Sequence, residues 1–202
     1  WAGYGEGRTK ALGVSAALVA GCHAIDAARW FADKDPGRAA VPVEVFAYSG
    51  GWRKGKEVEY DYFKNAWNPA PPLEYDDLEV ALIRYSNGAL SKVSTNYGCV
   101  MPYMLPVEVF GTRGTIKDNR VWSHKFPGQR GWVEIPTILP ESADVSHHPF
   151  QGEMDHFVDC VLNNREPPCS LSDAVLTHSI VFASLRCYET GQPVRLPLEE
   201  FL

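Results

Sequence analysis

The spacing of apolar residues divides the chain into three parts. Residues 13–33 carry an apolar stripe at helical spacing, formed by Leu18, Cys22, Ile25 and Ala28. This stripe predicts a helix that ends at the DKDP sequence of residues 33–36, because proline cannot continue a helix and restricts the residue before it. Residues 42–51, PVEVFAYSGG, then alternate apolar and polar side chains, which predicts a strand.

The middle of the chain alternates in the same way and predicts an antiparallel meander of about five or six strands. Residues 78–97 form two alternating runs around Asn87-Gly88, the preferred pair for a two-residue type I′ hairpin turn. Residues 106–124 predict a second strand pair that turns at Arg113-Gly114, and residues 132–139 predict one more strand. We interpret residues 52–77 as a long irregular segment, whose many aromatic residues indicate order and therefore function.

The last part predicts two helices and a short strand. Residues 148–166 place one apolar face on a helix, formed by Phe150, Met154, Phe157, Val158, Val161 and Leu162. The second helix begins near Ser170 and Asp173, which are typical of a helix N-terminus, and ends at Gly191. Residues 193–198, PVRLPL, predict a short last strand.

This order predicts a single α+β domain over residues 1–202, with an open, mostly antiparallel sheet and helices packed on one face. The other face would be apolar as well, because Phe46 and Tyr48 alternate with Val45 and Ala47. An uncovered apolar face is typical of a protein interface. We therefore expect a homodimer or tetramer that assembles through the open sheet face.

Composition and charge exclude several classes of partner. The formal net charge is −6, which argues against nucleic acid and anionic membrane surfaces because both need a basic footprint. No apolar run is long enough to span a membrane, and the first residues lack the apolar core of a signal peptide. The five cysteines include no CxxC pair, which indicates reduced, mostly buried thiols in a cytoplasmic protein. Because the chain opens on Trp1 and not on Met, we interpret it as a fragment or a processed piece.

A histidine interrupts the first predicted helix, in the sequence AGCHAIDAARWF of residues 20–31. Burying the imidazole of His23 would cost free energy unless a hydrogen bond satisfied it, so His23 is either a buried structural residue or a chemical group. Cys22 does not face His23, because adjacent helical residues point apart, and packing is the better interpretation for its thiol. Asp26 could orient the imidazole, but pairing with Arg29 competes for its carboxylate.

The sequence GCHAIDAARWF resembles the G-x-H-x-x-D-x-x-R-W segment in the C-terminal domain of the glucose–fructose oxidoreductase, inositol dehydrogenase and rhizopine-catabolism (Gfo/Idh/MocA) family. VEVFGTRGTI is similar to the strand–turn–strand unit of that family, and FQGEMDHFVDC to PVRLP is similar to its closing helices and last strand. The resemblance covers nearly all of the chain and implies a dihydrodipicolinate-reductase-like C-terminal fold.

The same resemblance implies a role for His23 as the general acid/base that takes the proton of a substrate hydroxyl, while hydride passes to NAD or NADP. Many family members place an aspartate four residues before this histidine, where this chain has Val19. The family's upstream Rossmann domain and its E-K-P lysine are absent, and GYGEGRTKALG does not fit the G-x-G-x-x-G spacing. We therefore expect no cofactor to bind this chain alone, and the chain alone to be inactive.

Four further residues are candidates for substrate binding. Trp67 and Asn68 lie in the aromatic segment, where an indole ring could pack on a sugar and an amide could bind its hydroxyls. Lys10 could bind an anionic substrate group, and Tyr103 lies at a Pro-rich strand break that could line a pocket. The histidines before residue 150 lack a recognised ligand spacing, so we expect no metal site.

Two classes of function remain open. The first is the substrate-binding and oligomerisation domain of an NAD(P)-dependent oxidoreductase acting on a sugar or polyol, or of an NAD-dependent glycosidase built on the same scaffold. The second is a stand-alone domain that only dimerises or binds a ligand.

Overall fold

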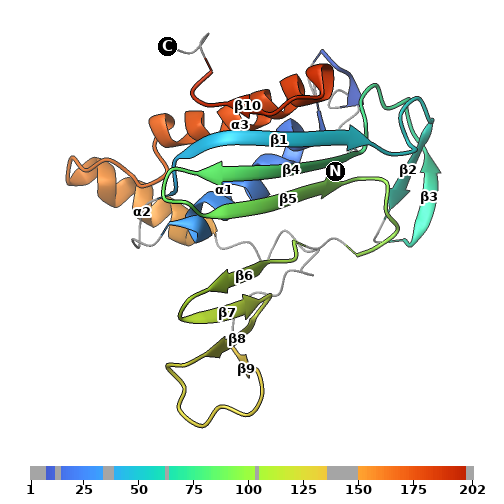
Figure 1. Cartoon of the computed structure of the whole chain (residues 1–202). Coiled ribbons are helices and arrows are strands. Elements are labelled where there is room, and N and C mark those ends of the chain that lie inside the picture. The colour runs from blue at the N-terminus through green and yellow to red at the C-terminus, as the bar shows by residue number, and fades with distance from the viewer. Residues whose placement is uncertain are drawn as a thin grey trace.

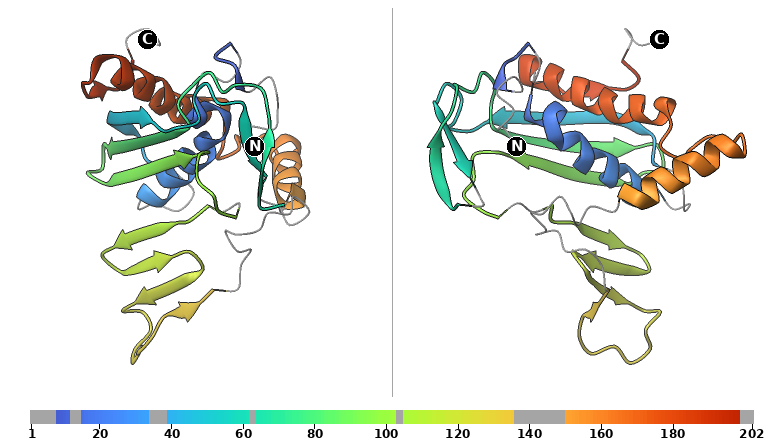
Figure 2. Two further views of the ribbon diagram at one scale, coloured as in Figure 1. Left: turned by 90° about the vertical axis from the view of Figure 1, so that its right-hand side faces the viewer. Right: turned by 180° about the vertical axis from the view of Figure 1, so that it is seen from behind.

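The computed structural model describes residues 8–11, 15–33, 39–61, 64–102, 105–135 and 150–198. Its largest sheet has four antiparallel strands in the order β10 (Val194–Arg195), β1 (Pro42–Gly50), β4 (Leu78–Tyr85) and β5 (Leu90–Asn96). Helices α1 (Cys22–Ala32) and α3 (Leu171–Thr190) lie across one face of this sheet, and Figures 1 and 2 show no described helix on the opposite face. The predicted α+β class, with helices on one face of an open antiparallel sheet, is confirmed.

The core lies between the sheet β10-β1-β4-β5, called the main sheet below, and the two helices. Val45, Ala47, Ile83 and Val93 are buried on the sheet side, and Ile25 is buried from α1. Helix α3 contributes the buried residues Ile180, Val181, Ala183 and Cys187. Strand alternation therefore separates a helix-facing set of side chains from an outward-facing set, as the sequence predicts.

The two ends of α3 are as expected. The Ser170 hydroxyl accepts a hydrogen bond from the Asp173 backbone N–H at 3.4 Å, and Gly191 has a φ of 66°, the left-handed geometry of a helix C-cap.

Near the start of the chain, a π-helix, η2 (Ala17–Gly21), directly precedes α1. The predicted helix of residues 13–33 is thus two segments of different winding.

Both predicted turns differ in detail from the structure. Two hydrogen bonds close the β4–β5 turn: the Gly88 N–H donates to the Tyr85 carbonyl, and the Tyr85 N–H donates to the Ala89 carbonyl. Gly88 alone in this loop has a positive φ, 85°, so the turn is a type I turn with a glycine bulge and not type I′. The β6–β7 turn falls one residue earlier than expected, because Gly114 already pairs with Gly111 inside the ladder.

The predicted single meander is wrong, because its strands form two sheets. Strands β6 (Glu108–Gly111), β7 (Gly114–Lys117), β8 (Arg120–Ser123) and β9 (Val133–Glu134) form a second antiparallel sheet, seen below the main sheet in Figure 1. Pro102 and Pro106 lie in the connection after β5. Because proline has no N–H to donate to a ladder, this connection is unsuited to continue the pairing.

The interpretation of residues 52–77 as irregular is also wrong. This segment contains a third sheet, the hairpin of β2 (Val58–Asp61) and β3 (Ala66–Pro69), in which Tyr60 pairs with Trp67 and Glu59 pairs with Asn68. The expectation that residues 52–77 are ordered is confirmed for the residues of this segment that the structure describes.

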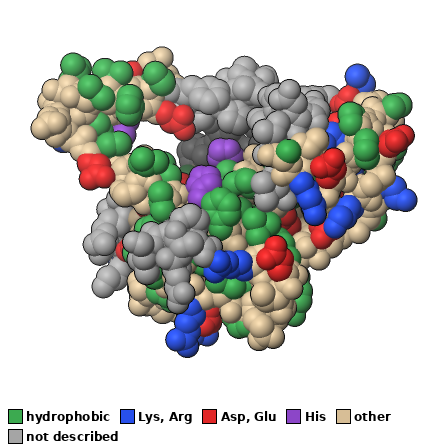
Figure 3. All heavy atoms as spheres, turned by 90° about the horizontal axis from the view of Figure 1, so that it is seen from above, with side chains coloured by type: hydrophobic (Ala, Val, Ile, Leu, Met, Phe, Trp, Pro, Cys, Tyr) green, Lys and Arg blue, Asp and Glu red, His purple; other side chains and the backbone are tan. Residues whose placement is uncertain are grey.

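Helix α2 (Phe150–Leu162) does not bury the apolar face expected of it. Met154, Phe157, Val158, Val161 and Leu162 are exposed, and Cys160 is its one buried residue with a described side chain. Figure 3 shows hydrophobic side chains gathered on the lobe at its left, the side on which Figure 1 draws α2. Amphipathic spacing predicted the helix correctly but not the surface that it packs on.

The cysteines form no disulfide, but most are not buried. Cys160 and Cys187 are buried, Cys22 and Cys99 are partly exposed, and Cys169 is exposed. Among the described residues, no helix is long and apolar enough to cross a membrane.

Candidate active site on helix α1

The helix that carries His23 is held at its N-terminal end by a buried carboxylate from the sheet. Glu79 of β4 accepts the backbone N–H groups of Ala16 and Ala17, each at 2.9 Å. These N–H groups have no partner within a helix, so a side-chain acceptor satisfies them in place of a local cap. Burial raises the pKa of Glu79, although the two N–H groups partly lower it again.

His23 lies near the start of α1 and is exposed. The structure gives its imidazole no hydrogen bond or ion pair within the described residues. The alternative of a buried structural histidine is therefore wrong. An exposed imidazole without a protein partner can accept a proton from a bound molecule, so the catalytic role remains a prediction that the geometry permits.

The neighbours of His23 in the sequence have other roles. The partly exposed Cys22 has a pKa raised chiefly by burial, so its thiol is not an activated nucleophile. Val19, at the position of the family aspartate, packs against the small cluster of Ala16, Leu73 and Tyr75. The described residues thus place no carboxylate in hydrogen-bond contact with the imidazole.

Asp26 belongs to a structural network and not to His23. Its Oδ1 accepts from the Thr177 hydroxyl at 2.7 Å and lies 3.5 Å from Nη1 of Arg29. Arg29 is fully buried and pairs with Asp173 of α3 at 2.7 Å, while its Nε donates to the Ala40 carbonyl. The predicted pairing of Asp26 with Arg29 is confirmed. The contacts of these two residues with Thr177 and Asp173 fix α1 against α3.

Trp67 and Asn68 do not act on the same side of the β2–β3 hairpin. Adjacent strand residues point to opposite faces, so Trp67 shares a face with its pairing partner Tyr60, and Asn68 shares the other with Glu59. Asn68 donates to Asp61 Oδ2 at 3.3 Å. The structure therefore separates two residues that the sequence suggested would bind one ligand together.

Trp52, which was not among the candidates predicted from the sequence, lies beside Trp67. Their ring centroids are 5.1 Å apart at an interplanar angle of 74°, an edge-to-face arrangement. Trp52 is one of the aromatic residues of the segment 52–77, which the sequence marks as ordered. The sequence does not show which of these aromatic residues contacts Trp67.

The remaining candidates give a mixed result. Lys10 is exposed, and its backbone N–H donates to Glu74 Oε2 at 2.8 Å. Nothing in the described structure joins Lys10 to His23 or Trp67. Tyr103 lies outside the described residues, as do His147 and His148. In the described part of the chain, no group of three or more His, Cys, Asp or Glu residues could hold a metal ion.

The described residues do not fit a dinucleotide cofactor. Such a cofactor needs a β–α–β unit whose glycine-rich turn opens a helix. The strand pairs of all three described sheets are antiparallel, and the one parallel contact is an isolated bridge between Lys54 and Leu73. We therefore derive no hydride step through residues of this chain.

Comparison with known proteins matches this chain to the C-terminal domain of one family. Residues 4–117, more than half of the chain, match the family described as "GFO/IDH/MocA C-terminal domain". The chain belongs to the GFO/IDH/MocA family, as the sequence resemblance implied.

Relatives and solved structures agree with this assignment. The chain is 24% identical over 128 residues to the scyllo-inositol 2-dehydrogenase (NAD(+)) of Bacillus subtilis, a match that covers 62% of this chain and 37% of that protein. The oxidoreductase domain protein from Kribbella flavida superposes with a TM-score of 0.67 at 17% identity, over 91% of this chain and 51% of that one. Levoglucosan dehydrogenase, solved with NADH and levoglucosan, gives a TM-score of 0.66 at 17% identity, over 89% and 49% of the two chains.

The chain spans about half the length of these structures and less of the curated relative. At this identity the solved structures show the fold alone.

Proposed function

We propose that this chain is the substrate-binding and oligomerisation domain of an NAD(P)-dependent oxidoreductase that acts on a sugar, polyol or related hydroxy compound. The observation that supports this proposal most is His23, an exposed imidazole without a described protein partner, on a helix fixed at both ends. Its position in the G-x-H-x-x-D-x-x-R-W segment of this family supports the assignment.

The chemistry derived for this chain is a proton transfer. Oxidation of an alcohol to a carbonyl removes the hydroxyl proton as well as a hydride. The Nε2 or Nδ1 atom of neutral His23 accepts that proton, and in the reverse direction the protonated ring returns it. Hydride transfer belongs to the nicotinamide cofactor, bound by a domain outside the described fold.

Two relatives support the substrate class. One is named as an inositol dehydrogenase and another was solved with levoglucosan, an anhydrosugar. Both substrates present several hydroxyl groups on a ring. We infer a ring-shaped polyhydroxy compound as the substrate of the complete enzyme.

The test is activity of the polypeptide that joins this chain to a dinucleotide-binding domain. Replacing His23→Ala should lower kcat by about 100- to 10,000-fold, the usual contribution of a positioned general acid/base. His23→Gln, which keeps hydrogen bonding but cannot exchange a proton at neutral pH, should be equally impaired. Unchanged kcat in both variants would refute the role of His23, and hydrolysis of glycosides without net NADH formation would favour the glycosidase alternative.

The 202-residue chain alone provides a second test. Titration with NADH, followed by nicotinamide fluorescence, should show no binding. Saturable binding would contradict the assignment of cofactor binding to another domain.

Oligomerisation is proposed to use the sheet face that no helix covers. Phe46 pairs with Leu82 on this face and Tyr48 pairs with Val80, so four apolar side chains adjoin one another. Tyr48 and Leu82 are 66% and 53% exposed, which is large for apolar residues in the middle of a sheet. Burial against a second copy would remove this surface from water.

A further inference from the structure

Two tryptophans at one end of the main sheet form an exposed aromatic surface. Trp52 is 51% exposed and Trp67 is 39% exposed, although they contact each other edge to face. We call Trp52, Trp67 and Tyr60 the aromatic platform. Tyr60 completes it, with its ring centroid 5.3 Å from that of Trp67.

Each ring of the platform has a fixed orientation. The Trp52 indole N–H donates to the Gly98 carbonyl at 3.0 Å, and the Tyr60 hydroxyl donates to Asn65 Oδ1 at 2.6 Å. The Arg53 guanidinium lies 5.8 Å from the centre of the Trp67 ring, a cation–π contact. Rings held in this way lose little conformational entropy when a ligand packs on them.

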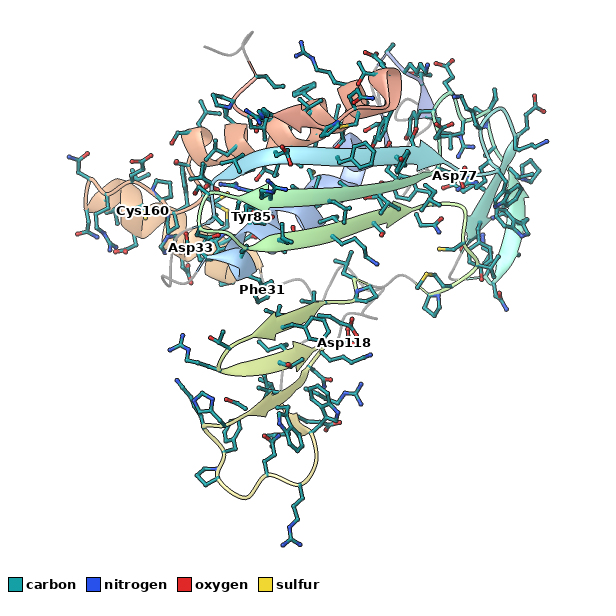
Figure 4. The ribbon with its side chains drawn as sticks, in the orientation of Figure 1. Phe31, Asp33, Asp77, Tyr85, Asp118 and Cys160 are labelled. Atoms are coloured by element: carbon teal, nitrogen blue, oxygen red, sulfur yellow. The ribbon has the colours of Figure 1, made fainter. Side chains whose placement is uncertain are left out.

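The platform stands on a buried polar base. Arg53 is 2% exposed, and its Nη2 donates to the Val58 carbonyl at 2.8 Å, while its backbone N–H donates to Asp77 Oδ1 at 2.9 Å. Arg8 is 1% exposed and donates to the same Val58 carbonyl and to the Pro71 carbonyl. Figure 4 shows Asp77 at the end of the sheet where the β2–β3 hairpin begins.

Burying two guanidinium groups is costly even when they are paired. Within the described part of the chain Arg53 Nε has no hydrogen-bond partner, and burial lowers the pKa of Arg53. The hydrogen bonds of the two guanidinium groups hold the hairpin rigid. The hairpin nevertheless leaves two large indole rings in contact with water. A rigid support beneath exposed aromatic rings is an arrangement suited to ligand binding.

We propose that the aromatic platform is a sugar-binding subsite, in which a pyranose ring packs its C–H face on the exposed indole of Trp52 or Trp67. This inference rests on the proposed function and deepens it, since it assigns residues to substrate recognition apart from His23. The indole surface is flat and apolar, and its negative face attracts the weakly positive C–H groups of a sugar. Asn68 is not part of the subsite, because it points to the other face of the hairpin.

Tyr97 connects the platform to the helix of His23. Its carbonyl accepts a hydrogen bond from Arg53 Nη1, and its hydroxyl donates to the Ala16 carbonyl at 3.3 Å. Ala16 is the residue before η2, at the end held by Glu79. The platform and the proton-accepting group are thus mounted on one hydrogen-bonded framework.

The experiment is a heteronuclear NMR titration of the 202-residue chain, observed at the indole N–H resonances of its six tryptophans. The probes are levoglucosan and methyl β-D-glucopyranoside, with the acyclic polyol mannitol at equal concentration as the reference. Trp52→Phe and Trp67→Phe assign the two platform resonances. We expect both sugars to shift these two resonances saturably, while the resonances of Trp122 and Trp132, which are 44% exposed on the second sheet, remain unchanged.

Variants then test the assignment. Trp67→Ala should weaken sugar binding by about tenfold or more, observed at Trp52, whereas Trp122→Ala should leave it unchanged. Equal shifts at all exposed tryptophans, equal shifts with mannitol, or no shift would each overturn the proposal. A shift that depends on protein concentration and not on sugar would identify a protein contact instead, and would also overturn it.

The outcome is independent of the proposed reaction. His23→Ala in the same chain should leave the platform shifts intact. If the sugars bind but His23→Ala does not impair the complete enzyme, the proposed function fails and the subsite stands. If His23→Ala abolishes activity and the sugars do not shift the platform, the subsite fails alone.

Discussion

Gly21 lies so close to Thr95 that no β-carbon fits between them. A β-carbon built on Gly21 would overlap Thr95 Oγ1 and would lie 3.2 Å from its Cβ and 3.3 Å from its Cγ2. Relieving the overlap would require the threonine side chain to turn its hydrogen toward residue 21, and the Thr95 Cβ would still lie at the tight distance of 3.2 Å. The last residue of the π-helix is thus a glycine for packing reasons, and its close approach to β5 sets the position of His23 two residues later.

Gly21→Ala is therefore expected to destabilise the chain, in spite of the higher helix propensity of alanine. Overpacking costs about 1–3 kcal/mol, whereas alanine in a helix gains at most about 1 kcal/mol over glycine. Urea unfolding followed by circular dichroism measures the difference. Gly152→Ala in α2 is the matched control, because nothing lies within 4 Å of its added β-carbon, and it should be neutral or stabilising. Destabilisation by both variants to the same degree would contradict the packing argument, and Thr95→Ala should partly rescue Gly21→Ala.

Arg29→Ala should destabilise the chain strongly. Removing one partner of a buried ion pair leaves Asp173 without its counter-ion and typically costs about 3–5 kcal/mol. Lys117→Ala is the control, because Lys117 pairs with Glu108 at 2.7 Å on the second sheet, both side chains are exposed, and such pairs contribute little to stability. Chemical unfolding of both variants decides the question, and similar midpoints for the two would disprove a structural role for the Arg29 network.

Glu79 should make the chain less stable as the pH rises, opposite to the usual carboxylate. Burial raises its folded-state pKa above the ordinary value of 4.5, so the folded protein holds this proton more tightly than the unfolded chain. Its contribution to stability is complete below pH 4.5 and declines as the pH rises through the folded pKa. Relative to Glu79→Gln, the natural chain should lose unfolding free energy as the pH rises above 4.5.

The exposed Glu57 supplies the comparison for this pH series. Glu57→Gln should follow the natural chain at every pH, since its side chain is at the surface. A constant difference between Glu79→Gln and the natural chain, or one of opposite slope, would show that burial does not govern the titration of Glu79.

Leu82→Lys should prevent assembly through the open sheet face. A charge at this position would be buried against a second copy without a partner. We therefore expect the dissociation constant of the oligomer to rise by at least about tenfold. Sedimentation velocity at micromolar concentration measures the oligomeric state. Leu171→Lys on α3 changes an even more exposed leucine, at 83%, on the helix side of the fold and should leave assembly intact. A natural chain that sediments as a monomer would end the proposal.

Local patterns predicted the elements of this fold better than their partners. Alternation located β1, β4 and β5, and the Ser170 and Gly191 signals located the ends of α3, because these features depend on neighbouring residues alone. The same patterns placed Gly114 in a turn. It lies inside β7, where it pairs with Ser123, and it is a glycine there because a β-carbon would come 2.5 Å from the carbonyl oxygen of Trp122, a residue eight positions away.

For the candidate site, too, the sequence predicted individual residues better than the contacts that these residues make. The sequence selected His23 and Trp67, and a resemblance of motifs gave His23 its expected role. It could not show that Trp67 and Asn68 face opposite ways, because strand pairing in residues 58–69 was not recognised. The charge of Arg8 favours solvent, yet the residue is buried because carbonyls from distant parts of the chain converge on its guanidinium.

The segment that carries the aromatic platform leaves and re-enters the main sheet at one place. Gly50 and Leu78 are paired across β1 and β4, so everything between them is a detour from a continuous hairpin. Such a detour can be exchanged as a cassette, provided that the replacement offers Arg8 its carbonyl acceptors and keeps the Asp77 carboxylate for the backbone at residue 53. Substrate preference could then be redesigned, or diversified by evolution, without rebuilding the scaffold beneath it.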